Sequence, residues 1–281
     1  MGSKKLYLIL VGLLVVSTMS ILVSAGNFEY NLNEIIENAK DFFIEVAKGN
    51  IPGQDSDNKF GENLDVGTLE EDIQSQGGTL EFLTTAEKIS IISSDTTNDI
   101  DGGDNANKVI IFGLDSNWNK ISEEVTLEAT EVNTTKEYLR VYRMYVSEVG
   151  TYGATNLGTI SGMASISGTK QIEIPAESGQ SQTTHYSVPA GYSLIITGVH
   201  ITVDTGKTID FFGKFRTNAN ETSNNMGAVR IIKTYKGLDS PLEVNFIGLK
   251  IPEKSDIWTT AISSVGSAKV SVDYDFLEYE D

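Results

Sequence analysis

Residues 108–127 read KVIIFGLDSNWNKISEEVTL, and this stretch decides the fold class. Apolar side chains recur at every second position on both sides of the polar segment 114–120 (Val109, Ile111, Ile121, Val125 and Leu127). A period of two on each side of a polar turn is typical of an antiparallel hairpin. The next run, residues 138–146, is apolar on both faces and predicts a central strand.

Further strand patterns extend in both directions from this hairpin. In the first half they cover residues 80–84, 88–93, 108–114, 120–127 and 138–146, and weak strands and turns follow over 150–168. In the second half they cover 171–174, 182–188, 193–203, 208–216, 229–235, 242–249, 257–263 and 269–277. This spacing favours β-sandwiches. We therefore predict a mainly β protein with two antiparallel β-sandwich-like domains, at residues 79–169 and 170–281.

Composition excludes several classes of function. The chain of 281 residues is 40% apolar, and it carries 39 acidic against 21 basic side chains, a net charge of −18. A surface this acidic repels phosphate backbones, so we predict no nucleic-acid partner. The sequence contains no cysteine, which excludes disulfides, thiolate metal sites and cysteine nucleophiles. We predict no cofactor.

The N-terminus has the pattern of a targeting segment. Lys4 and Lys5 precede an uncharged run over residues 6–25, and Val23-Ser24-Ala25 has the small residues of a signal-peptidase site. Residues 1–25 are therefore predicted to be a signal peptide or a membrane anchor through residues 6–25, with the rest of the chain outside. A buried structural helix is a third reading.

An amphipathic helix and a long arm are predicted for residues 26–78. Apolar residues recur at three- and four-residue spacing over 32–46, and Gly49 and Pro52 follow as stop signals. Residues 51–79 are rich in Gly, Asp and Asn and predict a loop or arm. Loops of this length are uncommon in compact domains, so we expect the arm to pack against a neighbour or another subunit.

Two groups of polar residues are candidates for chemistry. Asp95, Asp99, Asp101 and Asp104 form the densest acidic cluster, but the order of ligands of an EF-hand loop is missing. A solvated hairpin loop is our interpretation, with a weak Ca²⁺ site as the alternative. His185 and His200 each fall in phase with polar strand neighbours, so both are predicted to be exposed strand residues rather than general bases.

Carbohydrate chemistry is a second hypothesis. Trp118 or Trp258 could form a sugar-binding platform with a carboxylate pair, although aromatic residues in β proteins usually belong to the core. Glu123-Glu124 is explained as well by a charge at a strand edge. Two segments, 133–135 and 220–222, match the N-glycosylation pattern. The sequence contains no G-x-S-x-G, H-E-x-x-H, P-loop or G-x-G-x-x-G motif, and no catalytic, cofactor-binding or metal site is predicted.

A series of short blocks resembles a family of virion structural proteins of tailed phages, many of them marine or environmental. The blocks are EVAKGNIPG (45–53), KFGEN (59–63), DVGT (65–68), GLD (113–115) with the strand 123–127, YLRVYRMYV (138–146), VPAG (188–191) and EKSDI (253–257). They occur in the family's order and cover roughly residue 43 to the end. Relatives tend to carry a histidine where this chain has residues 54–58, and they usually begin near the helix without a leader.

The resemblance implies a β-rich, non-enzymatic subunit of a virus particle. From it we expect a homo-oligomer that also contacts other virion or surface proteins, located in a virion or at a cell surface. An exported carbohydrate-binding module or glycan-acting enzyme is the alternative.

Overall fold

The computed structural model describes residues 42–221 and 227–281. The chain divides into two units, Met1–Asp55 and Ser56–Asp281. In the first unit, residues 42–47 are helical and the helix ends at Gly49, whose φ of 73° places it in the left-handed region, as the stop signal predicted. The remainder of the predicted helix 32–46 and the leader 1–25 lie outside the described residues. Among the residues described, no helix is long and apolar enough to cross a membrane.

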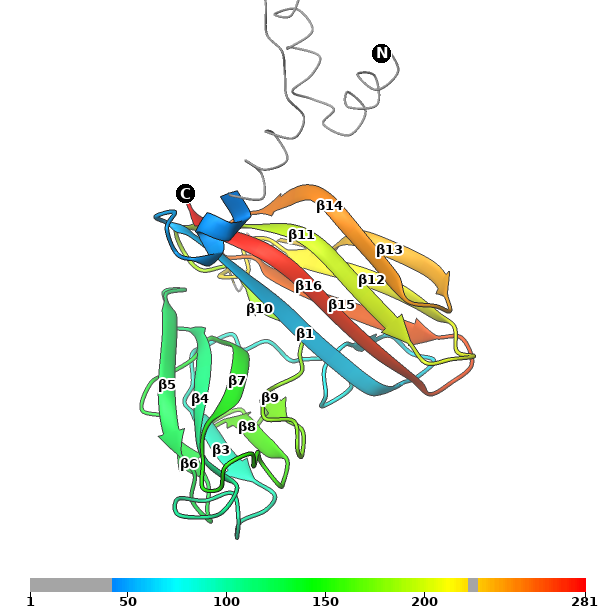
Figure 1. The fold of residues 1–281 in the computed structure, drawn as a ribbon. Helices are drawn as coiled ribbons and strands as arrows, with labels where there is room; N and C mark the ends of the chain where they lie inside the picture. The colour runs from blue at the N-terminus through cyan, green and yellow to red at the C-terminus, as the bar shows by residue number, and fades with distance from the viewer. Residues whose placement is uncertain (1–41, 222–226) are drawn as a thin grey trace, which may run out of the picture. The chain divides into compact units, whose positions relative to one another are not determined.

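The second unit is mainly β and contains several antiparallel sheets (Figure 1). Two of them share one core and are here called the first sheet pair. One has the order β6-β3-β8-β9 (β6, Val132–Asn133; β3, Ile89–Ser93; β8, Ile160–Ala164; β9, Lys170–Ile174). The other has the order β5-β4-β7 (β5, Lys120–Thr126; β4, Ala106–Leu114; β7, Arg140–Val149).

The predicted hairpin is confirmed as β4 and β5. Val109 pairs with Val125 and Ile111 with Glu123, in an antiparallel register that continues to Leu114 and Lys120. Val109 and Ile111 are fully buried, and Val125 is 4% exposed. Alternation therefore places these apolar side chains in the core of the first sheet pair, as the sequence indicated.

The prediction that residues 138–146 form a central strand is wrong, because β7 lies at an edge and β4 is central. Both faces of the chain are nevertheless mostly buried from Tyr138 to Met144, the start of β7 included. Val141 and Met144 belong to the core of the first sheet pair, whereas Leu139 and Tyr142 belong to the other large core cluster. An edge strand with a core on each side has the apolar pattern of a central one.

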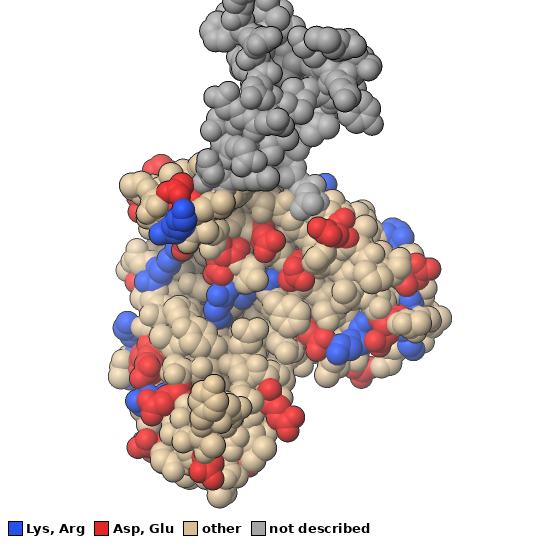
Figure 2. Space-filling view, in the orientation of Figure 1, with Lys and Arg blue, Asp and Glu red and all other residues tan. Residues whose placement is uncertain are grey.

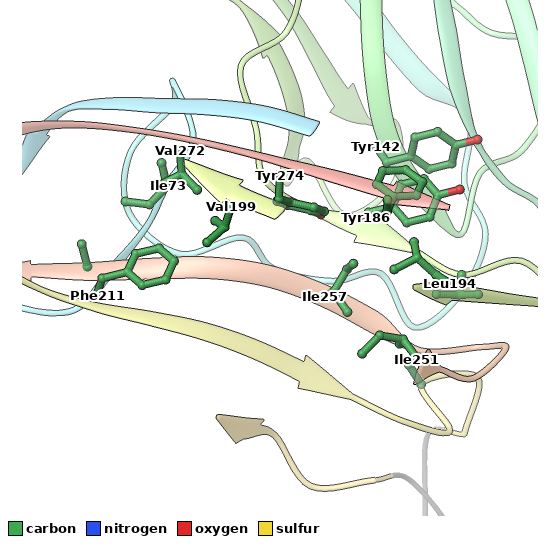
Figure 3. Packing of buried hydrophobic residues seen from close by; sticks show 14 of the residues in the cluster. Ile73, Tyr142, Tyr186, Leu194, Val199, Phe211, Ile251, Ile257, Val272 and Tyr274 are labelled. Carbon is green, nitrogen blue, oxygen red and sulfur yellow. The ribbon is translucent and has the colours of Figure 1, made fainter. Parts of the chain in front are cut away.

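The remaining sheets surround that larger cluster and are here called the second sheet pair. One has the order β1-β16-β11-β14 (β1, Gln54–Val66; β16, Ala268–Glu280; β11, Tyr192–Val203; β14, Leu242–Ile251). The other has the order β10-β15-β12-β13 (β10, Tyr186–Ser187; β15, Asp256–Ser263; β12, Ile209–Arg216; β13, Arg230–Leu238), and β2, Glu71–Asp72, pairs with β15. Figure 3 shows Phe211 and Ile257 of the second of these sheets pointing toward Val199 and Tyr274 of the first.

Three local predictions differ from the structure. Residues 54–66 of the predicted loop are the long strand β1, because alternate residues from Lys59 to Asn63 are buried while those between them are partly exposed. Residues 80–84 form no strand. Residues 170–174, expected to begin the second set of strands, pair with β8 in the first sheet pair.

Candidate functional site

The carboxylate of Asp256 is fully buried and accepts four hydrogen bonds, all from side chains. Arg140 of β7 donates to it through Nε at 2.9 Å and through an Nη at 3.1 Å. Arg216 of β12 donates at 2.6 Å, and the hydroxyl of Ser187 donates at 2.6 Å. One carboxylate therefore connects the first sheet pair, through Arg140, to two strands of the second.

The electrostatics of this junction keep the carboxylate ionised. Burial alone would raise the pKa of Asp256, but the Arg140 charge and the hydrogen bonds from Arg140, Ser187 and Arg216 hold it below its ordinary value. Arg140 is itself 4% exposed and also donates to the carbonyl oxygens of Leu83 at 2.8 Å and Leu139 at 2.9 Å. A carboxylate and a guanidinium that are both fully engaged hold structure rather than transfer protons.

Aromatic rings enclose the ionic groups. The guanidinium carbon of Arg140 lies 5.0 Å from the ring centroid of Phe82 and 5.0 Å from that of Trp118. Such contacts add about 1 kcal/mol or more when they are desolvated. Close by, a Cβ at Gly113 would stand 2.0 Å from the carbonyl oxygen of Arg140, so only glycine allows β4 and β7 to approach here.

Three of the blocks that carry the predicted family resemblance, 138–146, 188–191 and 253–257, contribute to this junction. Within the block 188–191, Val188 donates to Ser255 at 2.9 Å and Ala190 donates to the carbonyl oxygen of Trp118 at 2.9 Å. The blocks 138–146 and 253–257 supply Arg140 and Asp256. Residues far apart in the sequence thus converge to hold the sheet pairs together.

A buried lysine lies in another of these blocks. Lys59 of β1 is 3% exposed, and its ammonium donates to the carbonyl oxygen of Tyr142 in β7. Burial, together with the Arg143 charge, lowers the pKa of Lys59 to about 7, and Asp57 acts in the opposite direction. Arg143 in turn bonds Asp57 at 3.0 Å. The contact between β1 and β7 therefore depends on a titratable group, the Lys59 ammonium.

The prediction that His185 is exposed is wrong. Its residue is 3% exposed, and its Nε2 lies 3.1 Å from the Asp72 carboxylate. Its ring is stacked on Trp258 with centroids 6.2 Å apart. Only Tyr186 and Ser187 of the predicted strand 182–188 are in a strand, and every residue from 183 to 189 is buried, so period-two reasoning does not apply.

The other candidates behave as follows. His200 is exposed, as predicted, between Glu243 at 3.3 Å and Asp273 at 3.7 Å on neighbouring strands. Trp118 and Trp258 are 2% and 8% exposed, so these indoles form no sugar-binding platform at the surface. The core interpretation holds for both.

The aspartate-rich loop is only partly solvated. Asp99 is fully buried, and its carboxylate accepts hydrogen bonds from the Ser93 hydroxyl and from the backbone of Ala106, Leu157 and Gly158. Asp95 accepts from Thr97 and Asn98 in turn geometry. Over residues 42–221 and 227–281, no group of three or more acidic or histidine side chains is arranged to hold a metal ion.

Glu123 lies on β5, an edge strand, as the edge-charge interpretation expected. Its carboxylate accepts from the backbone of Thr135 at 2.7 Å and Lys136 at 2.9 Å, so it also fixes the following turn. The asparagines of the two N-glycosylation patterns, Asn133 and Asn220, are both exposed.

Sequence reasoning missed Arg140, Asp256 and Lys59. A signal was present for Arg140, since a charged residue in the apolar run LRVYRMYV must find a partner if the strand is buried. Asp256 and Lys59 carry no such signal, because each lies at the end of a polar segment. Their burial follows from pairings between distant strands.

Comparisons with known proteins give little further information. No family model matches the chain, and no curated protein matches it. Among solved structures, the chain is similar to T=1 particles derived from infectious bursal virus (TM-score 0.22, 12% identity, 85% of this chain and 79% of that chain). It is also similar to the VP2 subviral particle of infectious bursal disease virus (TM-score 0.20, 11% identity, 85% and 82%). Scores this low carry no argument about role, and the tailed-phage resemblance stays a prediction.

Proposed function

We propose that the protein is a non-enzymatic structural subunit of a virus particle or related surface assembly, and that it works by self-association. The observation that carries this proposal is the convergence of three distant segments, 138–146, 188–191 and 253–257, on the buried Arg140–Asp256 junction. In a catalyst, polar residues brought together from distant segments would be expected to line an accessible cleft. Here they join two sheet pairs into one body, and this is what a building block requires.

An exposed apolar patch supports association with a copy of the chain. Leu64, Leu69 and Val265 are 62%, 80% and 63% exposed. Nearby contacts bring their segments together, since Ser263 donates to the carbonyl oxygen of Gly67 at 2.8 Å and the Ser267 hydroxyl bonds Asp65. Apolar residues gathered at a surface are typical of contact sites.

Charge on the remaining surface is compatible with a soluble particle protein. On the face drawn in Figure 2, acidic and basic side chains are interspersed over a larger uncharged surface. In this proposal the two sheet pairs act as sandwich-like domains, residues 1–25 export or anchor the chain, and the partners are copies of the chain and other virion or surface proteins. The location is a virion or a cell surface.

Native mass spectrometry of the purified full chain tests the proposal. We expect a defined oligomer, and we expect the double substitution Leu69→Asp with Val265→Asp to shift it toward the monomer. The matched control is Leu157→Asp, at a position 42% exposed in the segment between β7 and β8, which should leave the oligomer intact. A strict monomer at micromolar concentrations would contradict self-association.

A further inference from the structure

The second sheet pair contains a cavity at the edge formed by β13 and β14. Its volume is about 450 Å³, and its lining residues come from both sheets. Ile196, Val199 and Leu249 line it from one sheet, and Phe215, Ile231 and Ile232 line it from the other. Ile231 is 57% exposed and Leu249 is 42% exposed, so apolar residues also form its rim. This volume lies within the range of about 300–1,000 Å³ usual for ligand sites.

Irregular strand pairing surrounds the cavity. The pairing of β11 with β14 passes from Ile196↔Leu249 to Gly198↔Asn245, and that of β11 with β16 shifts between the same two β11 residues. On the opposite sheet, the pairing of β12 with β13 passes from Gly213↔Lys233 to Lys214↔Ile231. Bulges bend strands and are frequent beside binding sites. The shifts occur at residues that line the cavity, among them Ile196, Gly213 and Ile231, and this indicates that the opening is built into the fold.

The polar groups of the lining already have partners in the protein. The Tyr274 hydroxyl donates to the carbonyl oxygen of Thr184 at 2.8 Å, and the Thr259 hydroxyl lies 2.9 Å from that of Thr184. The Lys214 ammonium bonds Glu70. A ligand inside the cavity would therefore meet mainly hydrocarbon, which favours an apolar chain.

Charge around the cavity differs from charge on the whole chain. The lining contains Lys214 and Lys233 and no carboxylate, although the sequence has 39 acidic and 21 basic residues. Because Glu70 pairs with Lys214, Lys233 is the lysine of the lining that concerns a head group. Lys233 is exposed, and its Cβ is the atom closest to a Cβ built at Gly213. A negatively charged head group would be favoured at this rim.

We propose that this cavity binds the hydrocarbon chain of a long-chain fatty acid, with the carboxylate at the rim beside Lys233. A methylene fills about the volume of a water molecule, roughly 30 Å³. A cavity of about 450 Å³ is therefore large enough for one such chain.

The test uses the full chain and the fluorescent probe cis-parinaric acid, displaced by palmitate. Gly213→Leu adds a side chain to the cavity lining at a position where a Cβ meets only ordinary contacts, at 3.7 Å or more. We expect saturable binding by the wild type and at least a tenfold loss in Gly213→Leu. Thr234→Leu adds the same side chain to β13 at an exposed position outside the lining, and should bind as the wild type does.

Head-group recognition is tested by Lys233→Met with Lys236→Met as its control. Lys236 pairs with Asp210 and is not part of the lining. We expect Lys233→Met to weaken palmitate binding about two- to fivefold, the effect of a partly exposed ion pair, and to leave binding of neutral hexadecanol unchanged. If Gly213→Leu fails to fold, the Lys233→Met comparison still decides. Absence of saturable binding by the wild type, equal binding by a folded Gly213→Leu, or equal loss of palmitate and hexadecanol would overturn the proposal.

Discussion

The Arg140–Asp256 junction and the β13–β14 edge of the second sheet pair differ in how completely their side chains are packed and hydrogen-bonded. At the junction Asp256 and Arg140 are buried and hydrogen-bonded, and Gly113 removes even the space of a methyl group. At the edge the strands lose register, leave a cavity and expose apolar side chains. The difference indicates that rigidity is concentrated where the sheet pairs meet, and that the opposite edge is the place for adaptable contacts.

The largest effect should follow from breaking the junction. Arg140→Met leaves the Asp256 carboxylate buried with one fewer cation, so we expect a loss of about 3–5 kcal/mol in the free energy of unfolding. Urea denaturation monitored by tryptophan fluorescence measures this loss. Arg143→Met is the matched control, since the Arg143–Asp57 pair is largely solvated (30% and 44% exposed side chains) and should contribute less than about 1 kcal/mol. Equal losses of unfolding free energy in Arg140→Met and Arg143→Met would mean that the buried junction contributes no more than a solvated ion pair.

A smaller difference in stability is expected between a truncation in the filled core and a truncation at the open edge. Ile111→Ala in the first sheet pair removes a fully buried side chain and should cost about 3 kcal/mol. Ile231→Ala, at a position 57% exposed on the cavity rim, should change stability by less than about 0.5 kcal/mol. The same denaturation experiment compares them, and a loss at Ile231 as large as at Ile111 would mean that the rim is packed in solution.

The contact between β1 and β7 should make stability depend on pH. The pKa of Lys59 is about 7 in the folded chain and 10.5 without burial, so between these values the unfolded chain binds more protons. Stability therefore rises with pH above 7, by at most about 1.4 kcal/mol per unit for this group. Thermal unfolding between pH 7 and about pH 9 should show the rise in the wild type and a weaker slope in Lys59→Met. The raised pKa values of Tyr186 and Tyr274 act only above pH 10. A wild-type slope equal to that of Lys59→Met would argue against a neutral buried amine.

The smallest effect concerns calcium. Because the Asp99 carboxylate is already occupied by four donors, 1 mM CaCl₂ should shift the melting temperature by less than about 1 °C. Differential scanning fluorimetry with and without chelator measures this shift. A larger stabilisation, lost in Asp101→Asn, would restore the metal alternative.

The sequence predicted elements with regular alternation and failed where burial depended on distant partners. The β4–β5 hairpin and the buried face of β16, with Val270, Val272, Tyr274 and Phe276, follow directly from period-two patterns. β1 was missed because its Gly, Asp and Asn residues are typical of loops, and only its pairing with β16 makes it a strand. His185 was misassigned because its segment is covered on all sides without being a regular strand.

Of the candidate sites, the exposure of His200 and the position of Glu123 at a strand edge could be predicted from the sequence, because both depend on one strand and its neighbours. The Asp256 junction could not be predicted from the sequence, because its members lie on four separate strands, β7, β10, β12 and β15. Charges without local partners are visible in a sequence, but the identity of the partner is set by topology.

The pairing of β1 with β16 joins the first long strand to the last one. During synthesis the strands of the first sheet pair are complete once residue 174 has emerged, whereas β1 has no paired strand until residues 268–280 appear. Folding of the nascent chain should therefore proceed in two stages, with β1 exposed for most of translation. Ribosome-bound chains that stop before residue 268 should retain a protease-sensitive N-terminal strand, and a C-terminal truncation should release the same strand in the finished protein.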